Sequence, residues 1–107
     1  MRYIYIHPID GIKAYDAEVS LSVLQKLVDG RITILPLSAS SDYTITAYAN
    51  EEGVIRKMMR NPYVLSFLQK IGADLYYTDV YGPVVIIGTN EDGEDVDLPL
   101  DIYNLAK

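Results

Sequence analysis

Two stretches of the chain alternate apolar and polar residues, which is the period of a half-buried β-strand. The first covers residues 3–7, where tyrosines alternate with isoleucines, and the second covers residues 43–48. Residues 80–88 contain four consecutive aliphatic residues and form the most apolar segment. A run that is apolar at every position suits a central strand that is covered on both faces, or covered by a helix on one.

Apolar residues recur on one helical face between residues 21 and 28, which predicts a first helix. Ser20 is placed to cap its start, and Gly30 stands where a left-handed C-terminal cap is expected. Residues 31–37 then predict a strand that ends near Pro36.

Two further helices are expected in the second half of the chain. The pair Asn61-Pro62 is typical of a helix start, and the apolar face that follows is stopped by Gly72. A short C-terminal helix is expected with Pro99 in its first turn and Asp97 as its cap.

Residues 49–53, ANEEG, predict a hairpin turn that leads to strand residues Val54 and Ile55. Residues 90–93, NEDG, predict a turn at the rim of the sheet, followed by a short solvent-facing strand over residues 94–98. The resulting order, β(β)αβββαβ(β)α, predicts an α+β fold: a single domain over residues 1–107, with a mostly antiparallel sheet of about five strands and roughly two or three helices on one face.

Composition narrows the possible chemistry. The 107 residues include no cysteine, which excludes disulfides, thiolate nucleophiles and zinc–thiolate clusters and is compatible with a reducing cytoplasm. There is no signal-peptide pattern, and the aliphatic runs are far shorter than the roughly 18 residues that a membrane span needs. We therefore expect a soluble, cytoplasmic protein.

The net charge of −6 is unevenly distributed. Residues 71–107 contain one basic residue, Lys107, against eight acidic ones, a net charge of about −7. Such a charge repels nucleic acid and anionic membranes and attracts basic protein surfaces. The simpler interpretation is that it only keeps a small domain soluble.

No motif frames a catalytic residue. The single histidine, His7, would have to serve any histidine-based triad, and none of the six serines lies in a nucleophile-elbow sequence. If Gly93 is aligned with the invariant glycine of a calcium loop, Gly88 and Pro99 fall where carboxylates are required. We expect no enzyme activity, no catalytic residues, no metal site and no cofactor.

Ten tyrosines without a tryptophan are the most unusual feature of the composition, and binding surfaces favour tyrosine. A mixed aromatic and acidic patch is expected in the segment DLYYTDVY, residues 74–81. Three other tyrosines, in the two alternating strands, could cover one face of the sheet: Tyr3, Tyr5 and Tyr48. The only basic cluster is RKMMR, residues 56–60, which could contact a phosphate or an acidic partner.

Three blocks of sequence, VLQKLVDGRITILPL, ITAYANEEG and VYGPVVIIGTNEDGEDVDL, resemble the domain-of-unknown-function family 3846, which is found in bacteriophages and in mobile elements of Gram-positive bacteria. The resemblance runs from about Val23 to Leu98 and is clearest at Gly82, Gly88 and the D-G-E turn of residues 92–94. Members of that family commonly have a short proline-rich link after the N-E-E-G turn, where this chain has the helical segment of residues 56–77.

The resemblance implies a phage or prophage accessory protein, many of which counter host defence. Our leading hypothesis is a non-enzymatic inhibitor, of anti-restriction or anti-CRISPR type, that mimics nucleic acid and occupies a basic, nucleic-acid-binding surface of a host protein. It would bind neither nucleic acid nor membrane directly. The expected partner-binding residues are Asp74, Tyr76, Tyr77, Asp79, Tyr81, Glu91, Asp92, Glu94, Asp95 and Asp97.

Two alternatives remain open. The protein could be an oligomeric sponge that sequesters a nucleotide immune signal, with ligand-binding residues Arg56, Lys57, Arg60 and Tyr48. It could also be a structural or regulatory module of a phage assembly.

Overall fold

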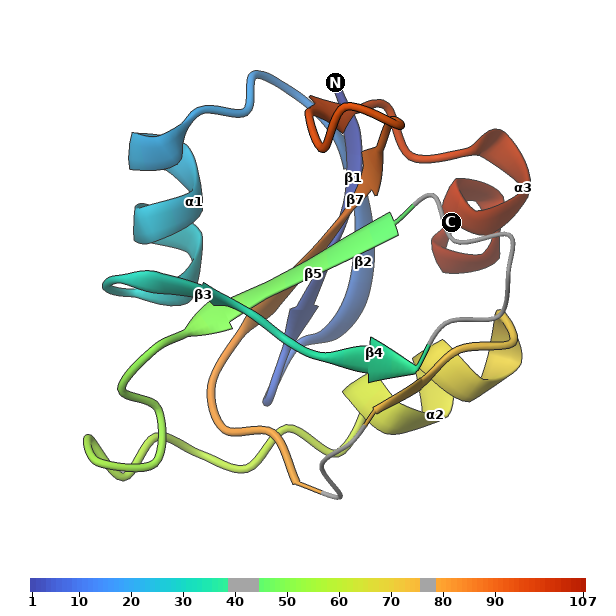
Figure 1. Cartoon of the computed structure of the whole chain (residues 1–107). Helices are drawn as coiled ribbons and strands as arrows, with labels where there is room; N and C mark the ends of the chain where they lie inside the picture. Colours follow the sequence, from blue (N-terminus) through green and yellow to red (C-terminus); the bar gives the residue numbers. More distant parts are fainter. Residues whose placement is uncertain (39–44, 76–78) are drawn as a thin grey trace.

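The computed structural model describes residues 1–38, 45–75 and 79–107 (Figure 1). The strands are β1 (Arg2–His7), β2 (Gly11–Asp16), β3 (Ile32–Ile34), β4 (Leu37–Ser38), β5 (Ile45–Asn50), β6 (Asp74–Leu75), β7 (Val84–Thr89) and β8 (Asp95–Val96). The helices are α1 (Leu21–Val28), α2 (Val64–Lys70) and α3 (Leu100–Tyr103), and a 3₁₀ turn, η1 (Asn104–Ala106), follows α3. This is the predicted α+β class.

The main sheet has six strands, and every pairing in it is antiparallel. Its order is β2-β1-β7-β5-β3, and β8 pairs with the last residues of β7. A second, two-stranded sheet joins β4 to β6. The predicted strand over residues 31–37 is therefore two strands in different sheets, and β6 was not predicted.

Strand β7 lies in the middle of the sheet, where its four aliphatic residues are fully buried because both faces of the strand are covered. Val84 and Ile86 point into the larger core, while Val85 and Ile87 point into a smaller one on the opposite face. Burying one such side chain contributes about 1.5–3 kcal/mol. The run thus requires covering layers on both sides of the sheet.

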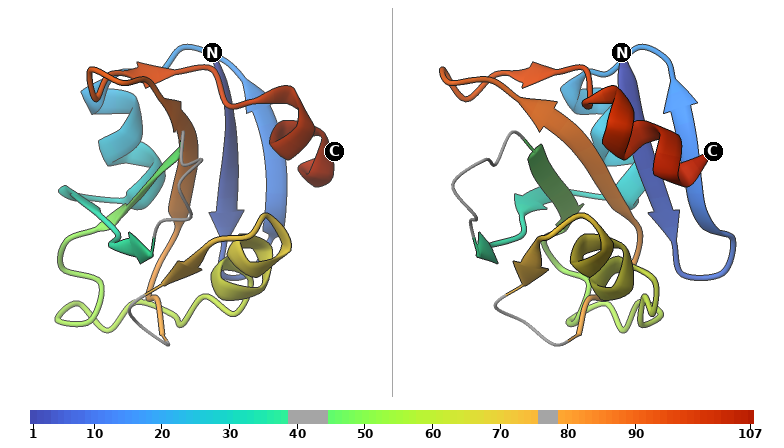
Figure 2. Two further views of the ribbon diagram at one scale, coloured as in Figure 1. Left: turned by 45° about the vertical axis from the view of Figure 1, so that its right-hand side comes forward. Right: turned by 90° about the vertical axis from the view of Figure 1, so that its right-hand side faces the viewer.

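Helices cover both faces, so the expectation of helices on one face was wrong (Figure 2). The larger core takes Val64, Phe67 and Leu68 from α2 and Tyr103 from α3. The smaller core takes its helical side chains from α1. The prediction that Tyr3, Tyr5 and Tyr48 cover one face of the sheet is confirmed, since all three lie on this second face, under α1.

The start of α1 is confirmed, since Ser20 Oγ accepts the N–H of Val23 over 3.3 Å. Its left-handed residue is Asp29 (φ 61°) rather than Gly30. Helix α2 begins at Val64, later than predicted. The buried Asn61 accepts the N–H of Tyr63 through Oδ1 over 3.2 Å, as a helix cap would, and its Nδ2 donates to the carbonyls of Ile6 and Gly82, both over 3.0 Å. In the described part of the chain no helix is long and apolar enough to cross a bilayer.

Candidate functional site

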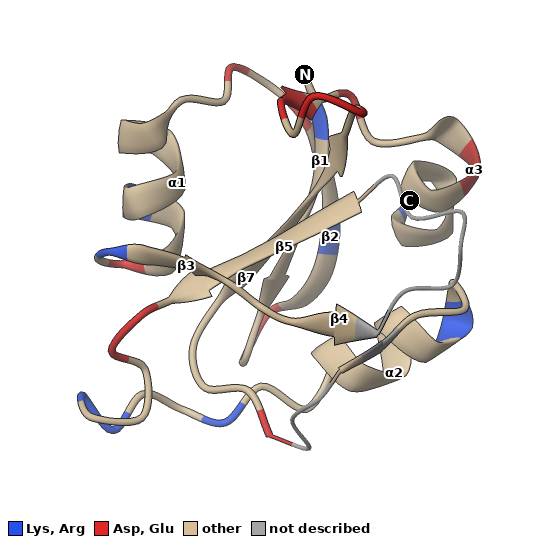
Figure 3. Ribbon diagram, viewed as in Figure 1, with Lys and Arg blue, Asp and Glu red and all other residues tan. Residues whose placement is uncertain are grey.

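Carboxylates gather at one end of the sheet, which we call the acidic end. It joins the β7–β8 turn to the ends of β1 and β2, because Arg2 is paired with Asp16 and its N–H donates to Asp97 Oδ1 over 2.7 Å. Figure 3 shows acidic residues on this turn and on the segment between β2 and α1. The acidic end comprises Asp16, Glu18, Glu91, Asp92, Glu94, Asp95 and Asp97.

Asn90 fixes the conformation of the β7–β8 turn. Its Oδ1 accepts the N–H groups of Asp92 (3.0 Å) and Glu94 (2.9 Å), and its Nδ2 donates to Glu94 Oε1 over 3.1 Å. The backbone N–H of Asn90 also donates to the carbonyl of Glu94 (3.0 Å). The exposed carboxylates of Glu91 and Asp92 therefore project from a closed turn, which lowers the entropy that a partner would have to remove.

Two carboxylates of the acidic end tie it to the sheet. Asp95 Oδ1 accepts the hydroxyl hydrogen of Tyr48 over 2.8 Å, and burial together with this bond raises the pKa of Tyr48 to about 12. The backbone hydrogen bond from Arg2 lowers the pKa of Asp97. Asp97 was predicted to cap α3, and this was wrong: no side-chain bond caps that helix, and Asp97 binds β1 instead.

Close backbone packing also fixes the acidic end. A Cβ at Gly88 would lie 2.3 Å from the carbonyl oxygen of Asp97 and 2.9 Å from that of Val96, well inside van der Waals contact. Only glycine lets β8 approach β7 this closely. The glycine and the D-G-E turn that mark the family resemblance thus both shape this end of the molecule.

The carboxylates of Glu91, Asp92 and Glu94 are exposed, and within the described residues none of them is paired with a Lys or Arg. The guanidinium of Arg2, in the neighbouring strand β1, donates through Nε to the carbonyl of Leu98 over 3.2 Å. The negative charge of the turn is therefore left available to a partner.

The ten residues predicted to bind a partner do not share one surface. Asp79 and Tyr81 precede β7 while Glu91 follows it, so they lie at opposite ends of a six-residue strand, about 20 Å long. Arg60 Nε donates to Asp79 Oδ1 over 2.6 Å, so this carboxylate is neutralised. Asp74 lies in β6. Tyr76 and Tyr77 lie outside the described residues.

The opposite end of the sheet carries a loop that the sequence interpretation missed. We call residues 51–60, together with the β1–β2 turn of residues 8–10, the loop end. Val54 and Ile55 were predicted to form a strand, but they lie in a turn and expose 70% and 80% of their surface. Ile9 and Met59 are also exposed, by 66% and 57%. Exposed apolar side chains that share one end of a small domain are typical of an interaction surface.

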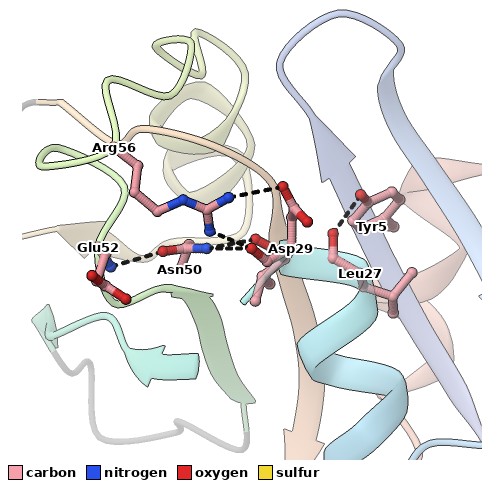
Figure 4. Close-up of polar contacts among 7 residues, drawn as sticks. Tyr5, Leu27, Asp29, Asn50, Glu52 and Arg56 are labelled. Carbon is pink, nitrogen blue, oxygen red and sulfur yellow. Dashed lines mark hydrogen bonds and ion pairs between the residues drawn. The ribbon is translucent and has the colours of Figure 1, made fainter. Parts of the chain in front are cut away.

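Asn50 and Arg56 hold this loop against the C-terminus of α1 (Figure 4). The buried Asn50 donates through Nδ2 to the carbonyls of Val28 (2.9 Å) and Asp29 (3.0 Å), and its Oδ1 accepts the N–H of Glu52 (2.7 Å). Arg56 bonds both the carbonyl and the carboxylate of Asp29. A cation at a helix C-terminus also interacts favourably with the helix dipole.

The last four carbonyl groups of an α-helix have no partner inside the helix. In α1, the N–H groups of Gly30 and Asp29 bond the carbonyls of residues 25 and 26 (2.9 and 3.3 Å), and the hydroxyl of Tyr5 bonds that of Leu27 (2.6 Å). Asn50 bonds the fourth. The loop is thus part of a fully satisfied helix end, which explains how exposed apolar residues can sit on an ordered segment.

Two open hollows of about 390 Å³ each flank this loop. The first lies between the loop, β3 and residues 79–81. The second lies between the loop, the β1–β2 turn and the end of α1, and its lining includes Tyr5, Ile9, Met59 and Pro83. Both linings are mainly apolar, so they suit a hydrophobic side chain better than a charged ligand.

The residues proposed for a nucleotide sponge are not assembled into one site. The ring of Tyr48 packs against the α1 side of the sheet and its hydroxyl bonds Asp95 at the acidic end. Arg56 and Arg60 are each paired with an aspartate of the same chain. A phosphate would have to displace both ion pairs.

His7 closes the β1–β2 turn, because its Nδ1 accepts the N–H groups of Ile9 (3.1 Å) and Asp10 (3.3 Å). Among the residues whose structure is described, no group of three or more His, Cys, Asp or Glu side chains is placed to hold a metal ion.

Comparisons with curated proteins and with solved structures gave no match. One family model matches residues 1–106, which is nearly the whole chain, including the segment of α2 where the sequence departs from the resemblance described above. The chain therefore belongs to the family described as "Domain of unknown function (DUF3846)".

Proposed function

We propose that this protein is a non-enzymatic accessory protein of a bacteriophage or mobile element that inhibits a host defence factor. It would bind, through the acidic end, the basic surface with which that factor holds nucleic acid. The observation that carries the proposal is a closed turn whose exposed carboxylates have no Lys or Arg partner in the described part of the chain. The setting comes from the family resemblance.

The density of charge supports mimicry of nucleic acid. The exposed carboxylates of Glu91, Asp92 and Glu94 lie within four consecutive residues, a stretch of chain no longer than about 14 Å. One strand of B-DNA carries a negative charge about every 3.4 Å along its axis. The two spacings are of the same order, so a surface that binds successive phosphates could bind successive carboxylates of this hairpin.

Long-range attraction would add to the contact. The chain has a net charge of −6, and the acidic end is separated by the length of β7 from the cations of the loop end. A field of one sign raises the rate at which an oppositely charged surface is met, and this effect falls with ionic strength. Binding to the host protein should therefore weaken strongly as salt is raised.

The test is capture of host proteins by the immobilised protein at low and high salt, followed by competition with duplex DNA for the captured protein. A triple variant, Glu91→Gln, Asp92→Asn and Glu94→Gln, removes three exposed charges but keeps Asp95 and Asp97, which hold the sheet together. We expect capture by the wild type to be lost in the variant, and to be displaced by DNA.

A matched control removes three exposed charges elsewhere. The control substitutions are Glu51→Gln, Glu52→Gln and Asp101→Asn. This variant should capture the same host protein as the wild type does. Equal capture by both triple variants, or capture that DNA and salt leave unchanged, would contradict binding through the acidic end.

A further inference from the structure

The loop end presents an apolar surface whose charges are already balanced. Arg56 is paired with Asp29, and Arg60 with Asp79. The exposed charges that remain on the loop are of both signs: Lys57 against Glu51 and Glu52. A strongly charged partner would gain little here, so the surface suits a partner that is itself apolar with a mixed polar rim.

We infer that the loop end binds a second copy of this chain, and that the protein is a two-fold symmetric dimer. A two-fold interface needs a patch that is complementary to itself. The loop end has the two parts required: the exposed side chains of Val54 and Ile55, which lie at the edge of the first hollow, and the second apolar hollow of about 390 Å³, lined partly by Met59 and Pro83. In the dimer each copy places Val54 and Ile55 in the second hollow of the other.

Charge favours the loop end over the acidic end as the place where copies meet. Two acidic ends would repel each other, because the exposed carboxylates of Glu91, Asp92 and Glu94 lack basic partners among the described residues. At the loop end, Lys57 of one copy can face Glu51 and Glu52 of the other across the two-fold axis. The dimer therefore keeps the two acidic ends far apart and free.

The available area is sufficient. A standard stable interface takes about 800 Å² from each partner, and the chain exposes 6227 Å², so such a contact would cover roughly one-eighth of its surface. One end of a molecule with extents of 33 × 27 × 27 Å can supply this area. The loop is also held rigid by Asn50 and Arg56, so association costs little ordering.

Sedimentation velocity across the micromolar range tests the inference. We expect the wild type to sediment as a dimer, and Ile55→Asp to weaken dimerisation roughly tenfold or more because it buries a charge in an apolar hollow. Ile55 is 80% exposed, so the variant should keep the wild-type circular dichroism and melting temperature. The matched control is Leu21→Asp, a similarly exposed residue (60%) at the opposite end of α1, which should remain dimeric.

A single thiol gives a second measurement, because the chain contains no cysteine. The alkylation rate of Ile55→Cys should fall as protein concentration rises, while that of Leu21→Cys should not change. Wild-type protein that stays monomeric throughout, or a dimer that Ile55→Asp leaves intact, would overturn the inference.

This inference does not depend on the proposed function. Dimerisation through apolar side chains should persist at high salt, whereas binding through the acidic end should not. The triple variant at residues 91, 92 and 94 should still form dimers. Loss of host-protein capture with dimerisation intact would therefore concern the acidic end alone, and a monomer that still captures a host protein would concern the loop end alone.

Discussion

Two four-residue sequences that differ at one position begin two very different loops: NEEG at residues 50–53 and NEDG at residues 90–93. Their local turns share two hydrogen bonds but differ at the glycine, which has a positive φ (81°) at Gly93 and not at Gly53. In each, the asparagine Oδ1 accepts the N–H two residues later, over 2.7 Å in the first and 3.0 Å in the second. In each, the glycine N–H donates to the asparagine carbonyl, over 3.3 and 3.1 Å.

The difference lies in what the sheet offers to the residues that follow. Beyond Gly93 the chain returns as β8, because β1 pairs with β7 only as far as Ile87 and leaves one side of Gly88 and Thr89 unoccupied. Beyond Gly53 there is no such place, because β5 is paired with β3 on one side and with β7 on the other. Vacant hydrogen-bonding positions in the sheet, together with the positive φ of Gly93, therefore distinguish the turn that becomes a hairpin.

The same contrast explains the character of the two surfaces. The hairpin takes its backbone hydrogen bonds from β7 and from its own turn, so its exposed side chains can be carboxylates. The loop after Gly53 obtains its hydrogen bonds from its own turns and from the C-terminus of α1, and it turns Val54 and Ile55 outward. Exposing these apolar side chains to water is unfavourable. A second copy of the chain that covers them would remove this cost.

The largest losses of stability are expected from substituting the two closely packed glycines, one at each end of the sheet. Each substitution should disrupt only its own end. Gly88→Ala should destabilise the fold by about 2–3 kcal/mol, because the new methyl group forces β8 away from β7. Gly53→Ala should cost a similar amount, since its Cβ would lie 2.6 Å from the carbonyl oxygen of Tyr81. Urea denaturation measures the loss.

Hydrogen exchange on the same two variants tests whether the ends are independent. Gly88→Ala should lose amide protection at residues 94–98 and keep it at residues 51–60, and Gly53→Ala should do the reverse. Loss of protection at both ends in either variant would show that the two regions are mechanically coupled.

Asn50 and Asn90 accept the same turn hydrogen bond, but Asn50 is buried and Asn90 is exposed. Asn50→Ala leaves the carbonyl of Val28 and the N–H of Glu52 without their partners and should cost about 2–3 kcal/mol. Asn90→Ala removes bonds that water can replace, and we expect about 1 kcal/mol or less. Equal losses in urea denaturation would mean that burial does not distinguish the two turns.

Tyr48→Phe removes the hydrogen bond that joins β5 to the acidic end. The free energy of unfolding should fall by about 1 kcal/mol near neutral pH, the contribution of one hydrogen bond. The pKa of Tyr48 is raised from 10.0 to about 12, so the folded chain keeps its proton where the unfolded chain releases it. The stability from this group is complete below pH 10 and is lost as the pH rises towards about 12.

Denaturation of Tyr48→Phe between these pH values provides the measurement. The variant should lose less stability than the wild type does over the same interval, because Tyr3 and Tyr5 still titrate but residue 48 no longer does. An unchanged alkaline slope would contradict the raised pKa of Tyr48, which burial and the hydrogen bond to Asp95 together produce.

Much of this fold could be predicted from the sequence, where the deciding interactions are local. The four aliphatic residues of β7, the Ser20 cap of α1 and the turn at residues 90–93 each act within a few positions of the chain. The alternation in residues 3–7 likewise fixed which side chains share a face, although not which helix would cover it.

The remainder depended on contacts between segments far apart in sequence. Val54 and Ile55 find no place in the sheet because β5 is already paired with β3 and β7. The amide of Asn61 donates to the carbonyls of Ile6 and Gly82, which are distant in sequence, and such contacts cannot be predicted from the local pattern. The charge count of residues 71–107 could not reveal that β7 separates Asp79 from the acidic turn. Of the acidic residues predicted to bind a partner, only Glu91, Asp92, Glu94, Asp95 and Asp97 lie together at the acidic end.

The smallest change in stability is expected at Asp97, whose carboxylate ties the acidic end to β1. The backbone hydrogen bond from Arg2 lowers the pKa of Asp97 below its usual value of 3.8 in the folded chain. The stability from this bond is therefore present above pH 3.8 and is lost as the pH falls through the lower, folded-state pKa. Asp97→Asn keeps an oxygen that can accept the N–H of Arg2 but has no charge to lose, so its stability should decline less in acid than that of the wild type, with little change at neutral pH. Acid titrations followed by circular dichroism, with the exposed Asp101→Asn as control, measure this difference. If both variants follow the wild type in acid, the acidic end is held to β1 by geometry alone, and its charges are free to serve a partner.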